Sequence, residues 1–204
     1  MTPKRTLVLA THNTHKIEEI KGVIGDRDLN IVSSADLNVP EPEETGSTFL
    51  ENALIKARFV AQFTGHLVLA DDSGMCADAL NGDPGVRTAD WAETPDGTRD
   101  YAMAMAKVHA ALLSKNAPRP WKANFNATMV LASPTGEFAV FVGVCDGQLV
   151  WPPRGTINFG FDPMFVPDGS DQTFSELSQE EKARYSHRGI ALRQLIAGWP
   201  DFAL

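Results

Sequence analysis

The sequence predicts an α/β fold in which helices flank a mixed sheet. Two patterns lead to this prediction. Short apolar runs of strand length alternate with amphipathic helical segments over the first third of the chain, and two strand-like segments flank a turn further on. The chain has 204 residues, enough for a full core, so residues 1–204 are expected to form a single domain.

The first strand is expected over residues 6–10, a second over residues 30–33, and a helix between them. That helix is indicated by isoleucines at helical spacing, Ile17, Ile20 and Ile24. The loop before it consists of Thr11, His12, Asn13, Thr14, His15 and Lys16. Such a loop offers backbone N–H groups and the positive end of the helix dipole to an anion, and Lys16 adds a cation. It is a candidate phosphate site, although it lacks the glycines of a P-loop or a dinucleotide-binding loop.

The connection over residues 36–45 is rich in proline and glutamate and contains Glu43 and Glu44. Acidic loops of this kind are usually solvated, yet one of the two glutamates could reach a metal. His12 and His15 do not indicate a zinc site, because no further cysteine or histidine lies nearby to complete the usual four ligands.

The clearest helix begins after Thr48, which forms a capping box with Glu51, and ends at Gly65. Its apolar residues recur on one face: Leu50, Ala53, Leu54, Ala57, Val60 and Ala61. This spacing is expected to leave Glu51, Asn52 and Lys56 off the face that packs on the core.

An apolar run over residues 67–70 then stops at Asp71, Asp72, Ser73 and Gly74. In open α/β sheets, ligands bind at the carboxyl ends of the strands, so this stretch is a candidate site for chemistry. Aspartate and glycine also suit a solvated turn, and the stretch alone does not separate the two interpretations.

The middle of the chain is expected to contain a tight loop, a helix and a hairpin, and the hairpin is interpreted as part of a second lobe over about residues 120–170. Residues 75–85 are dense in glycine and proline and are expected to form a tight loop. A helix follows, with Tyr101, Met105, Val108 and Leu112 on one side. Strands over residues 125–131 and 138–144 flank a turn and predict an antiparallel hairpin.

Aromatic and cationic residues mark the last third of the chain. Phe159 and Phe161 flank Gly160 and could form a slot for a flat ring, or could simply pack in the core, and Asp162 follows them. A capping box of Ser178 and Glu181 opens a short helix before a final amphipathic helix. The cations Lys182, His187 and Arg188 cluster there, either around a ligand or at a solvated helix junction.

Composition narrows the range of functions. The net charge of -8 argues against a broad basic surface for nucleic acid or anionic lipid, so an anionic small ligand needs local cations or a metal. Cys76 and Cys145 are the only cysteines, and they are expected to be free thiols in a reducing compartment. The apolar run near the N-terminus is too short for a signal peptide or a membrane span, and we expect a cytoplasmic protein.

Taken together, several short motifs resemble those of the inosine triphosphate pyrophosphatase family, also called Ham1-like or RdgB-like, which in bacteria includes the dITP/XTP pyrophosphatases. They run in order from residue 7 to about residue 195, and each is weak alone. The matching stretches are residues 11–16, 43–53, 71–74, 82–86, 159–163 and 186–188.

The resemblance implies an elongated, two-lobed α/β fold with a nucleotide groove between the lobes. It implies Mg²⁺-dependent hydrolysis of the non-standard purine nucleoside triphosphates dITP, ITP and XTP to the monophosphate and pyrophosphate, which keeps deaminated bases out of DNA and RNA. It also implies a homodimer.

The resemblance assigns roles to matching residues. The loop from Thr11 to Lys16 would hold the triphosphate, and Asp72 would accept a proton and bind the metal with Glu43 or Glu44. Ser73 would contact substrate. Phe159, Gly160, Phe161 and Asp162 would form the wall beside the base, and the nucleotide would also meet Lys182, His187 and Arg188.

Elementary chemistry agrees with these roles. Carboxylate oxygens suit Mg²⁺, and a carboxylate near a bound water can take its proton. His187 and Arg188 can donate to the 6-oxo group of hypoxanthine or xanthine, whereas adenine presents an amino group there and would leave donor facing donor. Asn158 and Phe161 depart from the glycine and tyrosine common in the family, which affects the expected ranking of substrates rather than the reaction.

Two alternatives remain at this stage. One is a Maf-like pyrophosphatase that acts on pyrimidine nucleotides, or a phosphatase that releases single phosphates. The other is a nucleotide-binding module without catalysis. The reaction products and the base preference distinguish the first alternative from a purine nucleotide pyrophosphatase. Mg²⁺-dependent turnover distinguishes the second, because a binding module has none.

Overall fold

The computed structural model describes residues 4–25, 28–156 and 159–203, and it has the expected mixed α/β fold. The sheet order is β2-β1-β3-β4-β5-β6. β1 pairs in parallel with β2 and β3, and β5 pairs antiparallel with β6. The elements are β1 (Arg5–Leu9), α1 (Thr14–Ile24), β2 (Leu29–Ser33), α2 (Phe49–Thr64), β3 (Leu67–Ala77), α3 (Tyr101–Ser114), β4 (Trp121–Ala132), β5 (Phe138–Leu149), β6 (Phe165–Pro167), α4 (Gln179–Tyr185) and α5 (His187–Ala197).

The chain divides into two compact units. Unit 1 comprises residues 1–72, 127–143 and 189–204, and unit 2 comprises residues 73–126 and 144–188. The bounds of unit 2 differ from the second lobe expected over residues 120–170, because long strands pass through both units rather than belonging to one. No helix in the described part of the chain is both long enough and apolar enough to cross a membrane.

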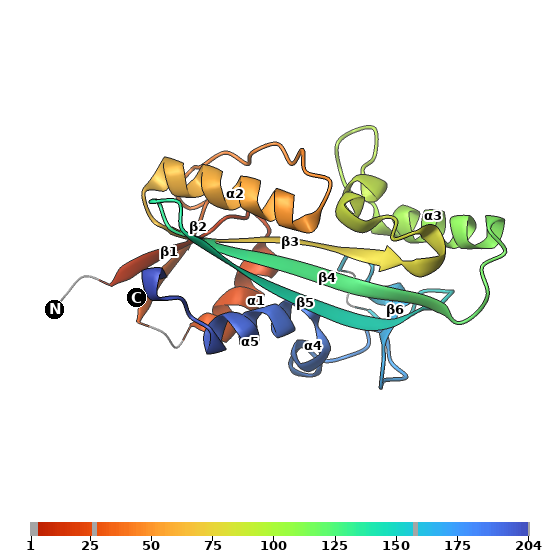
Figure 1. Ribbon diagram of the computed structural model, residues 1–204. Helices are drawn as coiled ribbons and strands as arrows, with labels where there is room; N and C mark the ends of the chain where they lie inside the picture. The colour runs from red at the N-terminus through yellow and green to blue at the C-terminus, as the bar shows by residue number, and fades with distance from the viewer. Residues whose placement is uncertain (1–3, 26–27, 157–158, 204) are drawn as a thin grey trace. The chain divides into compact units, whose positions relative to one another are not determined.

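Helices cover both faces of the sheet in unit 1 (Figure 1), and a hydrophobic core lies on each face. On one face, α2 packs on Val8, Val68 and Val130. On the other, α1 and α5 pack on Leu7, Leu69 and other residues of the sheet. Successive residues of a strand point to opposite faces, so the continuous apolar runs of β1 and β3 supply both cores.

Helix α2 begins and ends as the sequence predicts, whereas α1 begins at Thr14, inside the stretch of residues 11–16 that was expected to be a loop. Thr48 and Glu51 form both halves of the capping box, and Gly65 takes a left-handed conformation with φ 67° at the end of α2. One expectation for α2 is wrong. Asn52 and Lys56 are buried, with 3% and 9% of their surface exposed, because polar partners on β3 and the loop before α2 face them.

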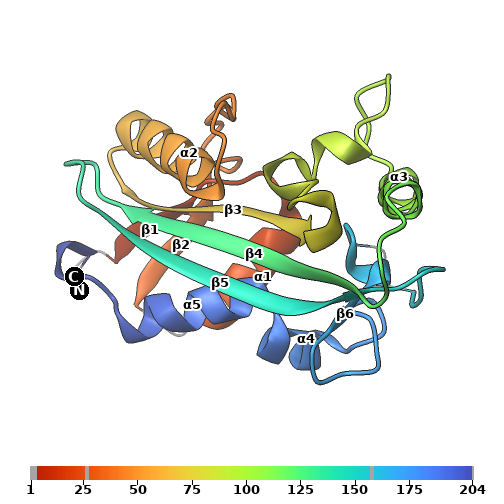
Figure 2. The same cartoon turned by 45° about the vertical axis from the view of Figure 1, so that its right-hand side comes forward.

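Unit 2 has an aromatic-rich core. It contains Phe125 of β4 and Phe165 of β6 together with Phe161, Phe174 and the buried face of α3. The predicted helix over Tyr101 to Leu112 and the predicted hairpin are confirmed, with β4 and β5 longer than expected. Figure 2 shows these two strands running side by side.

β3 does not end at Asp72, as the sequence suggested, but continues to Ala77. Its pairing with β1 stops at Leu69, so the polar stretch lies just beyond the carboxyl end of β1. Gly74 permits the continuation, because a Cβ at this position would collide with the carbonyl oxygen of Gly85. The glycine-rich loop after β3 therefore packs directly on the strand.

Candidate active site

The alternation of β3 separates Asp71 and Asp72. Asp72 follows Val68 and Ala70 on the face covered by α2, whereas Asp71 follows Leu67 and Leu69 on the opposite face. Both aspartates are buried, with 3% of Asp71 and 7% of Asp72 exposed. The two carboxylates consequently meet different partners.

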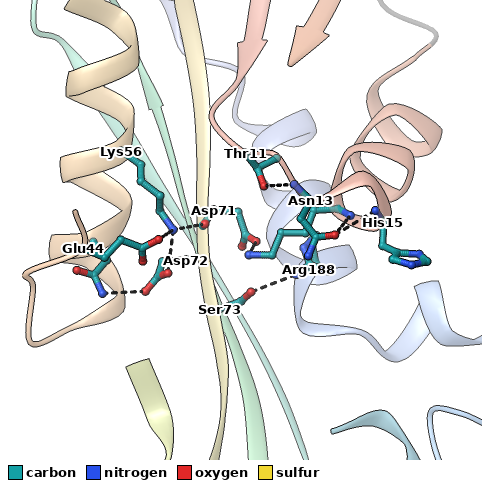
Figure 3. A network of polar contacts seen from close by, with 11 residues as sticks. Thr11, Asn13, His15, Glu44, Lys56, Asp71, Asp72, Ser73 and Arg188 are labelled. Carbon is teal, nitrogen blue, oxygen red and sulfur yellow. Dashed lines mark hydrogen bonds and ion pairs between the residues drawn. The ribbon is translucent and has the colours of Figure 1, made fainter. Parts of the chain in front are cut away.

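Asp72 belongs to a cluster that also contains Glu44, Asn52 and Lys56, which we call the acid–lysine cluster. Figure 3 labels Glu44, Lys56 and Asp72. The Lys56 ammonium donates to Asp72 Oδ1 at 2.9 Å and to the Asp71 carbonyl oxygen at 2.9 Å, and it lies 3.2 Å from Glu44 Oε1. The Asn52 amide donates to Asp72 Oδ2 at 3.4 Å and accepts from the Gly46 N–H. One ammonium thus serves two carboxylates.

Burial governs the protonation of this cluster. It raises the pKa of Asp72 to about 6, although the Lys56 ammonium opposes the change, and the nearby Glu44 carboxylate raises it further. Burial lowers the pKa of Lys56, but Asp72 and Glu44 outweigh this effect and raise it overall. Asp72 therefore titrates close to neutral pH, which suits a group that accepts and releases a proton.

On the other face of β3, Asp71 pairs with Lys16. Their Nζ and Oδ2 atoms are 2.7 Å apart, and the Asp71 side chain is 1% exposed. This pair holds the Lys16 ammonium at the start of α1. The role of Asp71 that follows from the geometry is to position Lys16.

The polar loop of residues 11–16 is closed by its own side chains. Asn13 caps α1, and its side-chain oxygen accepts from the N–H groups of His15 and Lys16. The Thr11 hydroxyl accepts from the Asn13 N–H, and His12 Nε2 lies 3.0 Å from the Val39 carbonyl oxygen. Thr14 and His15 are exposed. Because Asn13 already accepts from two of the N–H groups at the start of α1, a phosphate at this loop would contact side chains, including that of Lys16, rather than those two N–H groups. The sequence had predicted a site made mainly of backbone N–H groups.

The acid–lysine cluster contains donors that fit Mg²⁺. Glu44 and Asp72 approach closely enough to share Lys56, and carboxylate oxygens are ligands that Mg²⁺ takes, with waters and phosphate oxygens completing its shell. Glu43 forms no such ion pair within the described part of the chain, so the geometry favours Glu44 of the two candidates.

Unit 2 brings together Ser73, His187 and Arg188. The Arg188 guanidinium donates to the Ser73 hydroxyl at 3.1 Å (Figure 3). Arg188 is 3% exposed and His187 6% exposed, so these residues do not form the solvated junction that charge runs usually make. His187 lies at the start of α5 and stacks on Phe125, 4.9 Å between ring centroids.

The Asp162 carboxylate accepts a hydrogen bond from the Lys182 ammonium, and Asp162 is 3% exposed. The same ammonium lies 5.2 Å from the centre of the Phe159 ring. Phe161 does not form the second wall of a slot, since it is 1% exposed and packs edge-on against Tyr101 in the core. Gly160 has a φ of 57°, which turns the chain between the two rings. Asn158 lies outside the described residues.

Sequence reasoning missed Lys56 and Asn52. The sequence does contain a pattern that could have indicated them. Residues four apart on a helix share a face, and Asn52 and Lys56 directly precede the small residues Ala53 and Ala57 of the core-facing stripe. The prediction considered only the apolar residues of this helix, and it therefore did not indicate that the polar ones would contact the buried carboxylate of Asp72.

Known proteins resemble this chain in sequence and in fold. The profile of the Ham1 family matches residues 7–198. A dITP/XTP pyrophosphatase of Ruegeria pomeroyi is 51% identical over 193 residues, covering 95% of this chain and 94% of its own. One from Agrobacterium fabrum is 52% identical over 185 residues, covering 90% and 86%. The solved structure of a HAM1 protein from Coxiella burnetii superposes with a TM-score of 0.88 at 36% identity, covering 96% and 98%.

Proposed function

This chain belongs to the Ham1 family, and we propose that it is a pyrophosphatase that hydrolyses dITP, ITP and XTP to the monophosphate and pyrophosphate with Mg²⁺. The observation that carries the proposal is the acid–lysine cluster, in which the buried Asp72 has a pKa of about 6 beside Lys56 and Glu44. Across β3 from it, Asp71 holds Lys16, a cation for the triphosphate.

The reaction needs a base and cations to hold the phosphates. A water attacks one of the phosphorus atoms beside the α–β bridging oxygen while the Asp72 carboxylate takes its proton. The bond from that phosphorus to the bridging oxygen breaks, the bridging oxygen leaves with the other phosphorus, and the products are the monophosphate and pyrophosphate. Lys56 keeps Asp72 ionised before the transfer, and Asn52 holds its second oxygen.

Glu44 and Asp72 are the residues that would hold Mg²⁺. When bound, Mg²⁺ supplies charge neutralisation at the phosphates and lowers the pKa of a coordinated water.

We expect Glu44→Gln to raise the Mg²⁺ concentration needed for half-maximal turnover about tenfold or more, since it removes one of two carboxylate ligands. Glu43→Gln is the matched control, because it is the same change one residue away and should leave the Mg²⁺ requirement near that of the parent. The measurement is a Mg²⁺ titration of pyrophosphate release. An equal effect of the two changes would refute the choice of Glu44.

Lys16→Ala should raise KM for dITP by about tenfold to a hundredfold, with a smaller change in kcat, because a charge-assisted contact to phosphate is lost. Lys21→Ala, an exposed lysine later on α1, is the control. Steady-state kinetics distinguish the two. An unchanged KM in Lys16→Ala would remove Lys16 from the phosphate site.

Base selection is assigned to unit 2. His187 and Arg188 are buried and can donate hydrogen bonds, so a 6-oxo purine can accept from them, whereas a 6-amino purine would place donor against donor. A panel of dITP, XTP, dATP, dGTP, dTTP and UTP tests this function. Preference for dITP and XTP supports it, and preference for dTTP or UTP favours the Maf-like alternative.

We also propose a homodimer. β5 exposes large apolar side chains at alternate positions within unit 1, Phe138, Val140 and Val142. A stripe of this kind is unusual on a surface that faces only water, which supports association through it. Sedimentation of the parent chain measures the mass, and a monomer at micromolar concentration would contradict the proposal.

A further inference from the structure

The imidazole of His187 lies nearly flat against a phenyl ring of the unit 2 core. Phe125 of β4 stacks on it with 4.9 Å between the ring centroids and 13° between the ring planes. Each of the two residues is 6% exposed. The contact covers one face of the imidazole, and the two ring nitrogens lie at the edge of the ring, in its plane.

Phe125 is itself held by two deeper rings. Phe165 meets it edge-on at 4.8 Å and 74°, and Phe174 stacks on it at 5.8 Å and 22°. Phe165 and Phe174 also contact one another at 5.0 Å, and both are buried. The position of Phe125 is therefore set by the core, and the core in turn sets the surface on which His187 rests.

A flat neighbour matters for a histidine in particular. The torsion that turns the imidazole about its Cβ–Cγ bond has a broad profile, so the side chain alone does not fix the ring plane. The N–H bonds lie in that plane, and a hydrogen bond weakens steeply as its angle departs from linear. A phenyl wall against one face limits the rotation and thereby fixes the direction in which the ring donates.

We propose that Phe125 is a positioning residue for base recognition. It holds the His187 imidazole in the plane from which the ring can donate to the 6-oxo group of the purine, and it needs no contact with substrate. This inference rests on the proposed function, in which His187 recognises the base. Phe125 thereby contributes to discrimination between 6-oxo and 6-amino purines.

The test is the substrate preference of Phe125→Leu, which keeps an apolar side chain and removes the flat face. An aromatic pair contributes a factor of about two to ten. We expect KM for dITP to rise by about that factor with kcat changed less than about twofold, and the ratio of kcat/KM for dITP over dATP to fall by a similar factor. Phe125→Tyr keeps the flat face and should restore the ratio.

Leu112→Ala separates positioning from a general loss of packing. Leu112 is a buried residue of α3 in the same core, and its truncation is expected to lower stability while both Phe125 and His187 are kept. Thermal unfolding of both variants measures the stability that each one loses, so the substrate ratios can be compared at a known loss of stability. If Phe125→Leu does not fold, Phe125→Met, which also lacks a flat face, replaces it.

The dITP/dATP ratios of these variants decide whether Phe125 positions His187. A lowered dITP/dATP ratio in Phe125→Leu, with parent-like ratios in Phe125→Tyr and Leu112→Ala, supports the positioning role. A parent-like ratio in Phe125→Leu, or an equal fall in Leu112→Ala, overturns it. A parent chain that does not hydrolyse dITP refutes the proposed function itself, so the two failures are distinguishable.

Discussion

Asp72→Asn is expected to lower kcat for dITP by about 10³-fold while the chain stays folded. The change removes the charge that takes the proton of the attacking water and one of the two carboxylates available to Mg²⁺, yet it alters the side-chain volume little. The amide also cannot act as a base at any accessible pH, so raising the pH should not restore turnover. Steady-state kinetics across pH 5 to 9 with circular dichroism measure both parts of the prediction.

Asp146→Asn is a control for this change. Asp146 is an exposed aspartate on β5, outside the acid–lysine cluster, and its substitution should leave kcat within about twofold of the parent. Turnover by Asp72→Asn near the parent level would contradict the role of Asp72 as the base.

Lys56→Met should have the second-largest effect. The substitution keeps the length of the side chain and removes the ammonium shared by Asp72 and Glu44. Breaking a buried ion pair on one side typically costs ~3 kcal/mol or more, because a charge is left buried without its partner. We therefore expect a fall of about that size in the free energy of unfolding at pH 8, which lies above the pKa of about 6 of Asp72.

The direction of the pH effect follows from the pKa of Asp72. That pKa is already raised to about 6, and Lys56 is the main group that opposes the rise. Without Lys56 the pKa moves higher, so the ionised base becomes scarcer at pH 7 and the acid limb of kcat/KM shifts to higher pH. The stability loss should shrink as the pH falls through this region, since a protonated carboxylate no longer needs the cation.

Lys56→Arg is the matched variant, because it keeps the charge but not the compact ammonium. It should preserve the position of the acid limb better than Lys56→Met does. An acid limb at the parent position in Lys56→Met, measured at the same Mg²⁺ concentration, would show that Lys56 does not control the ionisation of Asp72.

Much of the fold is predictable from local sequence. The isoleucine spacing of α1, the Thr48–Glu51 capping box of α2 and the Ser178–Glu181 capping box of α4 each encode an element through contacts within a few residues. The end of β3 was not predictable in this way. Asp71, Asp72 and Gly74 are turn-forming residues, and only neighbours distant in sequence keep them extended.

The candidate site divides along the same line. Asp72 and the loop of residues 11–16 stand out locally, because polar residues follow apolar strands. The acid–lysine cluster cannot be recognised from local sequence, because Lys56 becomes a buried partner of Asp72 only when α2 packs on β3. For Phe161 the local sequence predicted a role in the site that the structure does not support. The ring was expected to line a slot for the base, but it is buried in the core.

The central claim is that Asp72 drives cleavage between the α and β phosphates of a non-standard purine nucleotide. The most direct measurement incubates dITP and Mg²⁺ with the parent chain and with Asp72→Asn, and separates dIMP, dIDP, pyrophosphate and orthophosphate. We predict equal amounts of dIMP and pyrophosphate from the parent and almost none from Asp72→Asn. Release of dIDP with orthophosphate, or pyrophosphate at parent levels from Asp72→Asn, would contradict the account.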